Sequence, residues 1–99
     1  MYENLLPIGT IVKLKGYDKL MMIFGVLQRS ANRPDITYDY ISVPYPEGHY
    51  DPKLHIGFNQ ADIESVIFKG YEDENNERKA FLASLDIAAM FKEKMENEK

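Results

Sequence analysis

Residues 10–25, with the sequence TIVKLKGYDKLMMIFG, decide the fold class of this chain. Apolar and polar side chains alternate over residues 10–15, as they do in a half-buried strand. Residues 16–19 are a short turn-forming connection, and the apolar run 20–27 is expected to return antiparallel, as a hairpin. That run is apolar on both faces, which predicts a central strand buried on both sides for part of its length, and Gly25 predicts a bulge or bend within it. One face of the first strand is predicted to hold Thr10, Val12 and Leu14, and the opposite face Ile11, Lys13 and Lys15.

Three further strands are predicted after the hairpin, over residues 36–43, 55–58 and 65–71. The segment 44–48 stops the first of them, because its two prolines cannot donate to a strand ladder. Asn59, with Asp62 three residues later, predicts a single 3₁₀ or α turn that ends near Glu64. A helical interpretation of residues 62–69 competes with the last strand, but Val-Ile-Phe followed by glycine favours the strand.

From about residue 73 onward, apolar residues recur every three or four positions instead of every second position. This spacing predicts an amphipathic helix over about 73–96, with a possible break between Ser84 and Asp86. The tail 93–99 is charged throughout and is expected to fray. The residues that recur at helical spacing are Phe81, Leu82, Leu85, Ala88, Ala89 and Lys92.

This order of elements predicts a mainly β (α+β) fold in a single domain over residues 1–99. We expect a small SH3-like antiparallel β-barrel of about five strands over residues 7–71, followed by the C-terminal amphipathic helix. The alternative is an open, twisted antiparallel sheet with the helix packed across one face. Both alternatives belong to the same class.

Composition excludes several kinds of chemistry. The chain has 99 residues and no cysteine, so disulfides, thiolate nucleophiles and cysteine-ligated zinc are excluded together. The net charge of −4 comes entirely from residues 56–99, since the first 55 residues balance six basic against six acidic side chains. The one local lysine cluster falls on the predicted hairpin, where lysine more often blocks strand pairing than contacts phosphate, so we expect no nucleic-acid binding. It consists of Lys13, Lys15 and Lys19.

The sequence predicts a cytoplasmic protein without membrane contact. The first six residues lack both the basic region and the apolar region of a signal peptide. The longest apolar run, 20–27, is far shorter than the ~20 residues that a membrane helix needs.

We find no arrangement of residues typical of an enzyme, and we expect neither catalysis nor a cofactor. No nucleophile elbow and no phosphate-binding glycine loop is present. Asp39 is the one acid in an apolar context, and a hydrogen bond to neighbouring backbone is a more common role for such a residue than catalysis. His49 and His55, with Asp51 between them, match no metal-ligand spacing, so we expect no metal site.

Two groups of residues are candidates for binding another protein. The first combines tyrosines with rigid prolines, a composition enriched at interfaces, although these tyrosines could equally cap the end of a barrel. The second is a methionine-rich apolar surface on the helix, which suits adaptable helix binding or a homodimer but could also belong to the core. The first group is Tyr40, Pro44, Tyr45, Pro46 and Tyr50, and the second is Met90, Phe91 and Met95.

Four segments together resemble one small bacterial family, domain of unknown function 4176. They are LPIGTIVKLKG (6–16), KLMMIFG (19–25), YDYISVPYPEG (38–48) and DIESVIFKGY (62–71), and the third is the most specific. The resemblance implies a protein of Gram-positive bacteria that occurs beside type VII secretion components and their LXG-type toxins. It further implies a cytosolic accessory factor that accompanies an effector, and it brings no catalytic residues.

We therefore expect a non-enzymatic adaptor or chaperone-like protein that binds a type VII effector or its helical targeting partner. The alternatives are an immunity protein that blocks a toxin and a generic SH3-like regulatory module. Survival of bacteria that express the toxin in the cytosol would distinguish immunity from an adaptor role.

Overall fold

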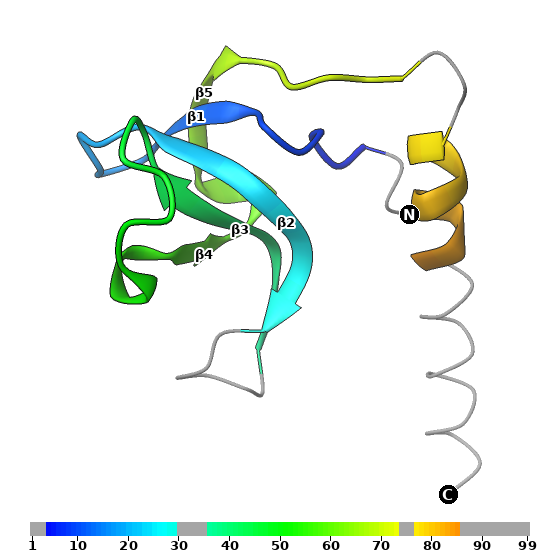
Figure 1. Cartoon of the computed structure of the whole chain (residues 1–99), viewed down its shortest axis with the longest axis horizontal. Coiled ribbons are helices and arrows are strands. Elements are labelled where there is room, and N and C mark those ends of the chain that lie inside the picture. The colour runs from blue at the N-terminus through cyan, green and yellow to red at the C-terminus, as the bar shows by residue number, and fades with distance from the viewer. Residues whose placement is uncertain (1–3, 30–35, 74–76, 86–99) are drawn as a thin grey trace, which may run out of the picture. The chain divides into compact units, whose positions relative to one another are not determined.

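Within residues 4–29, 36–73 and 77–85, which the computed structural model describes, five strands form one antiparallel sheet (Figure 1). Their order across the sheet is β4-β3-β2-β1-β5, so the predicted hairpin strands lie side by side and β2 is central. A helical segment covers residues 77–85, and the predicted mainly β fold with a C-terminal helix is confirmed. The elements are β1 (Ile11–Leu14), β2 (Met21–Arg29), β3 (Thr37–Pro44), η1 (Pro52–Leu54), β4 (Ile56–Phe58), η2 (Gln60–Asp62) and β5 (Ile63–Phe68), where η denotes a 3₁₀ turn.

Contacts divide the chain into two compact units. Residues Leu5–Tyr71 form one unit and contain the whole sheet. Met1–Asn4 and Glu72–Lys99 form the other, which contains the helical segment. In that segment Leu82 is buried and Phe81 is exposed.

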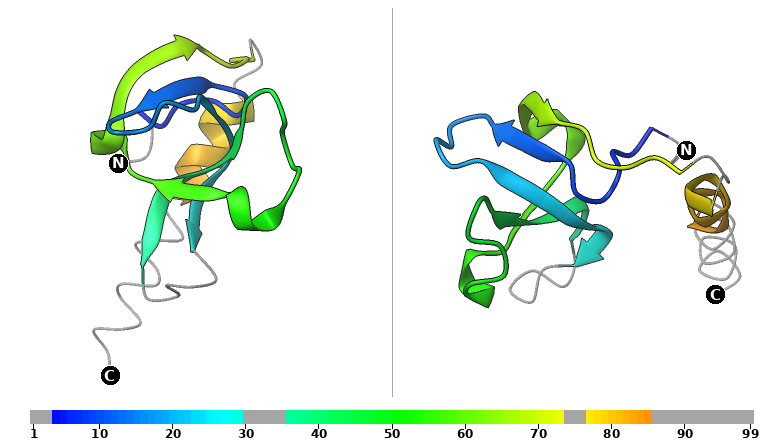
Figure 2. Two further views of the ribbon diagram at one scale, coloured as in Figure 1. Left: turned by 90° about the vertical axis from the view of Figure 1, so that its left-hand side faces the viewer. Right: turned by 45° about the horizontal axis from the view of Figure 1, so that its top comes forward.

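The sheet is open. β4 and β5 follow each other in the chain through η2, yet they are the two opposite edges of the sheet and do not pair with each other (Figure 2). The closed SH3-like barrel that we expected is therefore not confirmed, and the open sheet kept as the alternative describes the strand arrangement. Every neighbouring pair in it is antiparallel.

The first hairpin follows its sequence pattern on one face only. Thr10, Val12 and Leu14 are all buried, as the alternation predicts. The second strand is expected to be buried on both faces for part of its length. Met21 and Ile23 are buried on one face, whereas on the other face Met22 is half-buried and Phe24 is 42% exposed. The bulge predicted at Gly25 is confirmed by a register shift between Ile23 and Gly25 against β3.

Tyr40 is the centre of the core. Its side chain is fully buried, and its ring lies 5.3 Å from that of Phe58. Its hydroxyl donates to Gln60 Oε1 at 2.5 Å and accepts the Leu6 backbone N–H at 2.9 Å. One side chain thus joins β3, η2 and the segment that leads into β1.

The start of β5 differs from its prediction. The Asn59 N–H donates to Asp62 Oδ2 at 2.9 Å, so the predicted turn forms as η2 and ends at Asp62. β5 consequently begins at Ile63, two residues early, and it ends at Phe68. The two register shifts along its pairing with β1 also make this strand irregular.

Candidate functional site

The loop between β3 and β4 presents a group of exposed aromatic side chains. Tyr50 is 79% exposed and Tyr45 is 45% exposed. The His55 ring lies 5.1 Å from that of Phe24 on β2 and 4.9 Å from that of His49. Together with Leu54 of the same loop and Phe24 of β2, these side chains make up what we call the aromatic loop surface. It consists of Phe24, Tyr45, His49, Tyr50, Leu54 and His55.

Backbone hydrogen bonds hold the first half of the loop. The Tyr45 N–H donates to the Leu20 carbonyl at 2.9 Å, which ties the loop to the start of β2. The Gly48 N–H donates to the Pro44 carbonyl at 2.7 Å, and this turn places Gly48 at φ +70°, where glycine has no steric penalty. The loop therefore needs little ordering before it contacts another surface.

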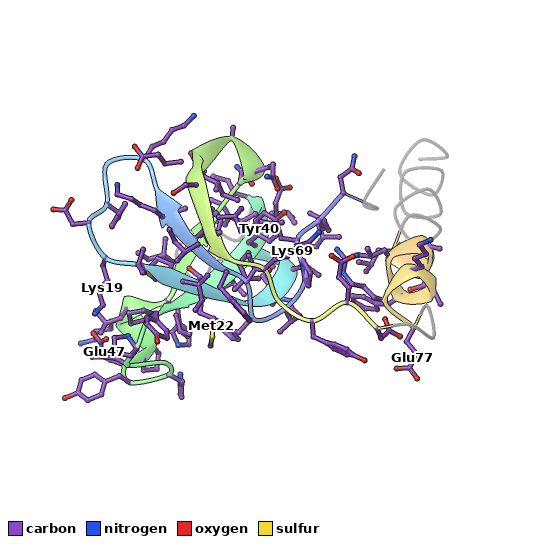
Figure 3. All side chains as sticks on the ribbon, turned by 90° about the horizontal axis from the view of Figure 1, so that it is seen from above. Lys19, Met22, Tyr40, Glu47, Lys69 and Glu77 are labelled. Atoms are coloured by element: carbon purple, nitrogen blue, oxygen red, sulfur yellow. The ribbon has the colours of Figure 1, made fainter. Side chains whose placement is uncertain are left out.

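One ion pair holds the loop against the first hairpin. Lys19 Nζ lies 2.7 Å from Glu47 Oε1, and the two side chains approach each other in Figure 3. The hydrogen bond from Lys19 lowers the pKa of the exposed Glu47 carboxyl. At neutral pH, Glu47 is therefore charged and paired with Lys19, a member of the lysine cluster of the first hairpin.

The second half of the loop is closed by η1, which the sequence analysis missed. Asp51 Oδ1 accepts the Lys53 N–H at 2.9 Å, and Pro52 occupies the first turn, where its missing N–H costs nothing. The Asp-Pro pair was the available signal for this turn. The turn brings His55 back to His49, with 2.8 Å between His49 Nδ1 and His55 Nε2.

The predicted Tyr/Pro group divides between core and surface. Tyr40 and Pro44 are buried, so they belong to the core and not to an accessible surface. Tyr45, Pro46 and Tyr50 are exposed in the loop. The predicted helix surface, which is Met90, Phe91 and Met95, lies outside the described residues.

Asp39 has the backbone role that the sequence analysis favoured. Its Oδ2 accepts the Gln60 N–H at 2.9 Å, and its own N–H donates to Asn59 Oδ1 at 2.9 Å. Both bonds connect β3 to the turn before β5. This carboxylate therefore supports the fold of the turn.

A groove of about 170 Å³ lies beside the β4 edge of the sheet. It has room for roughly one large side chain, and apolar and charged groups share its wall. The Lys15 N–H donates to the Asp62 carbonyl at 2.9 Å on one side of it. The lining residues are Leu14, Lys15, Tyr17, Ile56, Gly57, Phe58 and Asp62.

Both edges of the sheet are poor templates for an added strand. β4 has only three residues, and β5 carries two register shifts. Short and bulged edge strands discourage pairing with another chain.

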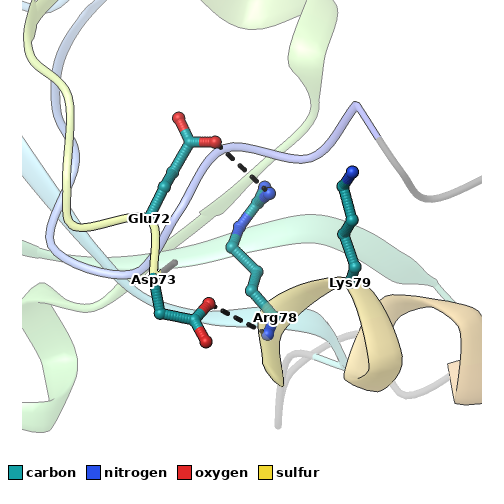
Figure 4. A pocket seen from close by; sticks show the side chains of 4 residues that line it. All are labelled: Glu72, Asp73, Arg78 and Lys79. Carbon is teal, nitrogen blue, oxygen red and sulfur yellow. Dashed lines mark hydrogen bonds and ion pairs between the residues drawn. The ribbon is translucent and has the colours of Figure 1, made fainter. Parts of the chain in front are cut away.

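The start of the helical segment contains a cluster of charged groups (Figure 4). Asp73 accepts the Glu77 N–H through Oδ2 at 2.8 Å and the Arg78 N–H through Oδ1 at 3.2 Å. Arg78 Nη1 lies 3.9 Å from Glu72 Oε2. The pocket that these residues line with Lys79 is only about 50 Å³. The two hydrogen bonds that Asp73 accepts from the backbone hold the first turn of the helix.

Comparison with known proteins identifies the family. The model of a family described as domain of unknown function, DUF4176, matches residues 5–79. The chain belongs to the DUF4176 family. No curated protein and no solved structure matches the chain. The matched range contains the aromatic loop surface and the start of the helical segment, and the predicted helix surface at residues 90–95 lies beyond it.

A further finding concerns membranes. Among the residues of this DUF4176 chain that the structure describes, no helix is both long enough and apolar enough to cross a bilayer.

Acidification is expected to loosen the start of the helical segment. The hydrogen bonds from the Glu77 and Arg78 backbone lower the pKa of Asp73 below its ordinary value of 3.8. Its stabilising effect is therefore complete above that ordinary value and is lost as the pH falls through the lower, folded-state value. An NMR titration should show the Glu77 and Arg78 amide signals moving together with the Asp73 carboxyl. Asp73→Ala should abolish this titration and reduce helicity at pH 7, whereas an ordinary Asp73 pKa would contradict the assignment.

Proposed function

We propose that the protein is a non-enzymatic accessory protein that binds another protein through the aromatic loop surface. The observation that carries the proposal is the exposure of Tyr50 and Tyr45 on a loop that is already held in place. Tyrosine supplies a large contact area at a small cost in side-chain entropy and is enriched among the residues that dominate interfaces. A surface of this kind suits recognition of a protein.

The partner that we propose is an LXG-type effector of a type VII secretion system, or the helical protein that targets it. This part of the proposal is supported by membership of the DUF4176 family together with the association that the resemblance implies. An adaptor or chaperone of this kind would act in the cytoplasm. It would shield or present part of the effector before export.

The absence of catalysis is also part of the proposal. Asp39, the acid singled out from the sequence, is used to hold the turn before β5. Asp51 begins η1. These two described acids thus hold backbone turns of the fold.

Tyr50→Asp is expected to weaken effector binding at least tenfold, because it removes an aromatic anchor and places a charge in the contact. Stability should change little, since Tyr50 is 79% exposed. The measurement is calorimetric titration of the purified chain with a separately purified LXG-type effector. Tyr71→Asp is the matched control, because Tyr71 is 72% exposed in the same unit but lies outside the aromatic loop surface.

Equal losses in the two variants, or no loss in Tyr50→Asp, would contradict binding through the loop. The bound part of the effector separates the remaining alternatives. Binding to the LXG region supports the adaptor role. Binding to the toxin domain, with protection of cells that express it, would replace the adaptor role with immunity.

A further inference from the structure

The two histidines of the chain are in direct contact. His49 Nδ1 lies 2.8 Å from His55 Nε2, although the residues are six apart and on either side of η1. His49 is exposed and His55 is half-buried, so water reaches the pair. Each ring has access to solvent hydrogen bonds, yet the fold directs two imidazole nitrogens toward each other.

The positions of both rings are set by their surroundings. Phe24 packs edge-on against the His55 ring at 5.1 Å, with 64° between the ring planes. The His55 N–H donates to the Pro52 carbonyl at 3.2 Å, which fixes the backbone at the end of η1. His49 follows Gly48, whose turn is closed by its bond to Pro44. The pair is therefore part of the ordered loop.

We propose that His49 and His55 form a two-histidine site for a late first-row divalent cation, Cu²⁺ or Ni²⁺. Imidazole nitrogen is a preferred ligand of these ions. Within the described residues no group of three or more His, Cys, Asp or Glu side chains could hold a metal, so water would complete the coordination. Asp51 does not join the two histidines in such a group, and its Oδ1 accepts the Lys53 N–H.

The separation of the two nitrogens selects the ion. Two nitrogens that are each about 2.0 Å from one ion and 2.8 Å apart subtend roughly 90° at the ion. This is the angle between adjacent ligands in the square or octahedral geometries of Cu²⁺ and Ni²⁺. Tetrahedral Zn²⁺ would require a separation of about 3.3 Å, so it would have to move the rings apart.

Metal binding would require a change of tautomer and a rotation of the rings, because the nitrogen lone pairs that now lie along the line between the two rings would have to turn toward one ion beside it. In the hydrogen-bonded pair one ring carries its proton on the facing nitrogen and the other ring accepts it. With the ion bound, both facing nitrogens must present lone pairs. The donor ring then carries its proton on its outer nitrogen, through exchange with water, and the pair as a whole releases no proton.

Retention of the untagged full chain on Ni²⁺-nitrilotriacetate resin tests the site, because that chelate leaves only two adjacent coordination positions open. We expect retention that imidazole reverses and that His49→Gln and His55→Gln each abolish. With Ni²⁺ in solution, calorimetry should show one ion per chain, and each variant should weaken binding at least tenfold. Mg²⁺ should not bind, and Zn²⁺ should bind more weakly than Ni²⁺.

The chain has two histidines and no cysteine, so no other imidazole or thiolate can account for binding of Ni²⁺. Asp51→Asn is the matched control, because its amide oxygen can still accept the Lys53 N–H and binding of Ni²⁺ should persist. Far-UV circular dichroism verifies that each variant is folded. Failure of the folded wild-type chain to bind Ni²⁺, or binding that survives in the variant lacking both histidines, would overturn the proposal.

Discussion

Gly70→Ala is expected to lower the free energy of unfolding by about 3 kcal/mol or more, a loss typical of severe steric conflict. A Cβ atom at this position would overlap the Ile8 carbonyl oxygen and lie 3.0 Å from the Thr10 nitrogen. Those atoms belong to the main chain, so rotation of a side chain cannot relieve the clash. The Gly70 N–H also donates to Thr10 Oγ1 at 3.0 Å, so a shift of the backbone would strain a bond to a buried side chain.

Urea unfolding followed by circular dichroism measures this loss, and Gly16→Ala is its control. Gly16 has a φ of +80°, and no heavy atom lies within 4 Å of the point that an alanine Cβ would occupy, so alanine there meets only backbone strain. That strain is expected to cost about 1 kcal/mol. Equal losses at the two glycines would show that the close approach of residues 8–10 to Gly70 is absent in solution.

Tyr40→Ala is expected to cost about 3–5 kcal/mol, because it empties the centre of the core. Tyr40→Phe isolates the hydroxyl, which bonds Gln60 Oε1 and the Leu6 N–H. The conservative variant should lose about 1–3 kcal/mol, since both partners are left without this bond in a partly buried site. Thermal or urea unfolding measures both changes.

Tyr50→Phe is the matched control for the hydroxyl of Tyr40. Its side chain is exposed, so removal of its hydroxyl should change stability by less than about 0.5 kcal/mol. A Tyr40→Phe variant as stable as the wild type would contradict the bridging role of the hydroxyl. These results would also determine which tyrosines can be substituted safely in binding studies, since loss of binding in a Tyr40 variant would reflect unfolding.

The predicted interaction group shows why residue type alone does not locate a surface. Tyr40 and Tyr50 belong to the same tyrosine- and proline-rich stretch, yet one is fully buried and the other is 79% exposed. The difference arises because β3 continues to Pro44 and directs Tyr40 into the core, whereas Tyr50 lies in the loop beyond it. Phe24 was assigned to a buried strand but lies on the surface, at the point where the register of β2 shifts.

The sequence by itself determined the features that neighbouring residues encode. Alternation over residues 10–15 placed Val12 and Leu14 inward, and the Asn59–Asp62 signal located the turn before the last strand. Such signals act over a few residues, where backbone geometry and local hydrogen bonds decide the conformation. The family resemblance was likewise readable from short segments and is confirmed over residues 5–79.

Only the tertiary structure decided whether the sheet closes, which tyrosines are exposed, and that His49 meets His55. Closure depends on the curvature and register of strands that are far apart in the chain, and here the bulged β5 and the short β4 remain separate edges. The histidine contact depends on η1 and on Phe24 from β2, neither of which is visible in a spacing of six residues. Contacts between distant residues are set by packing of the whole sheet, and no local pattern specifies them.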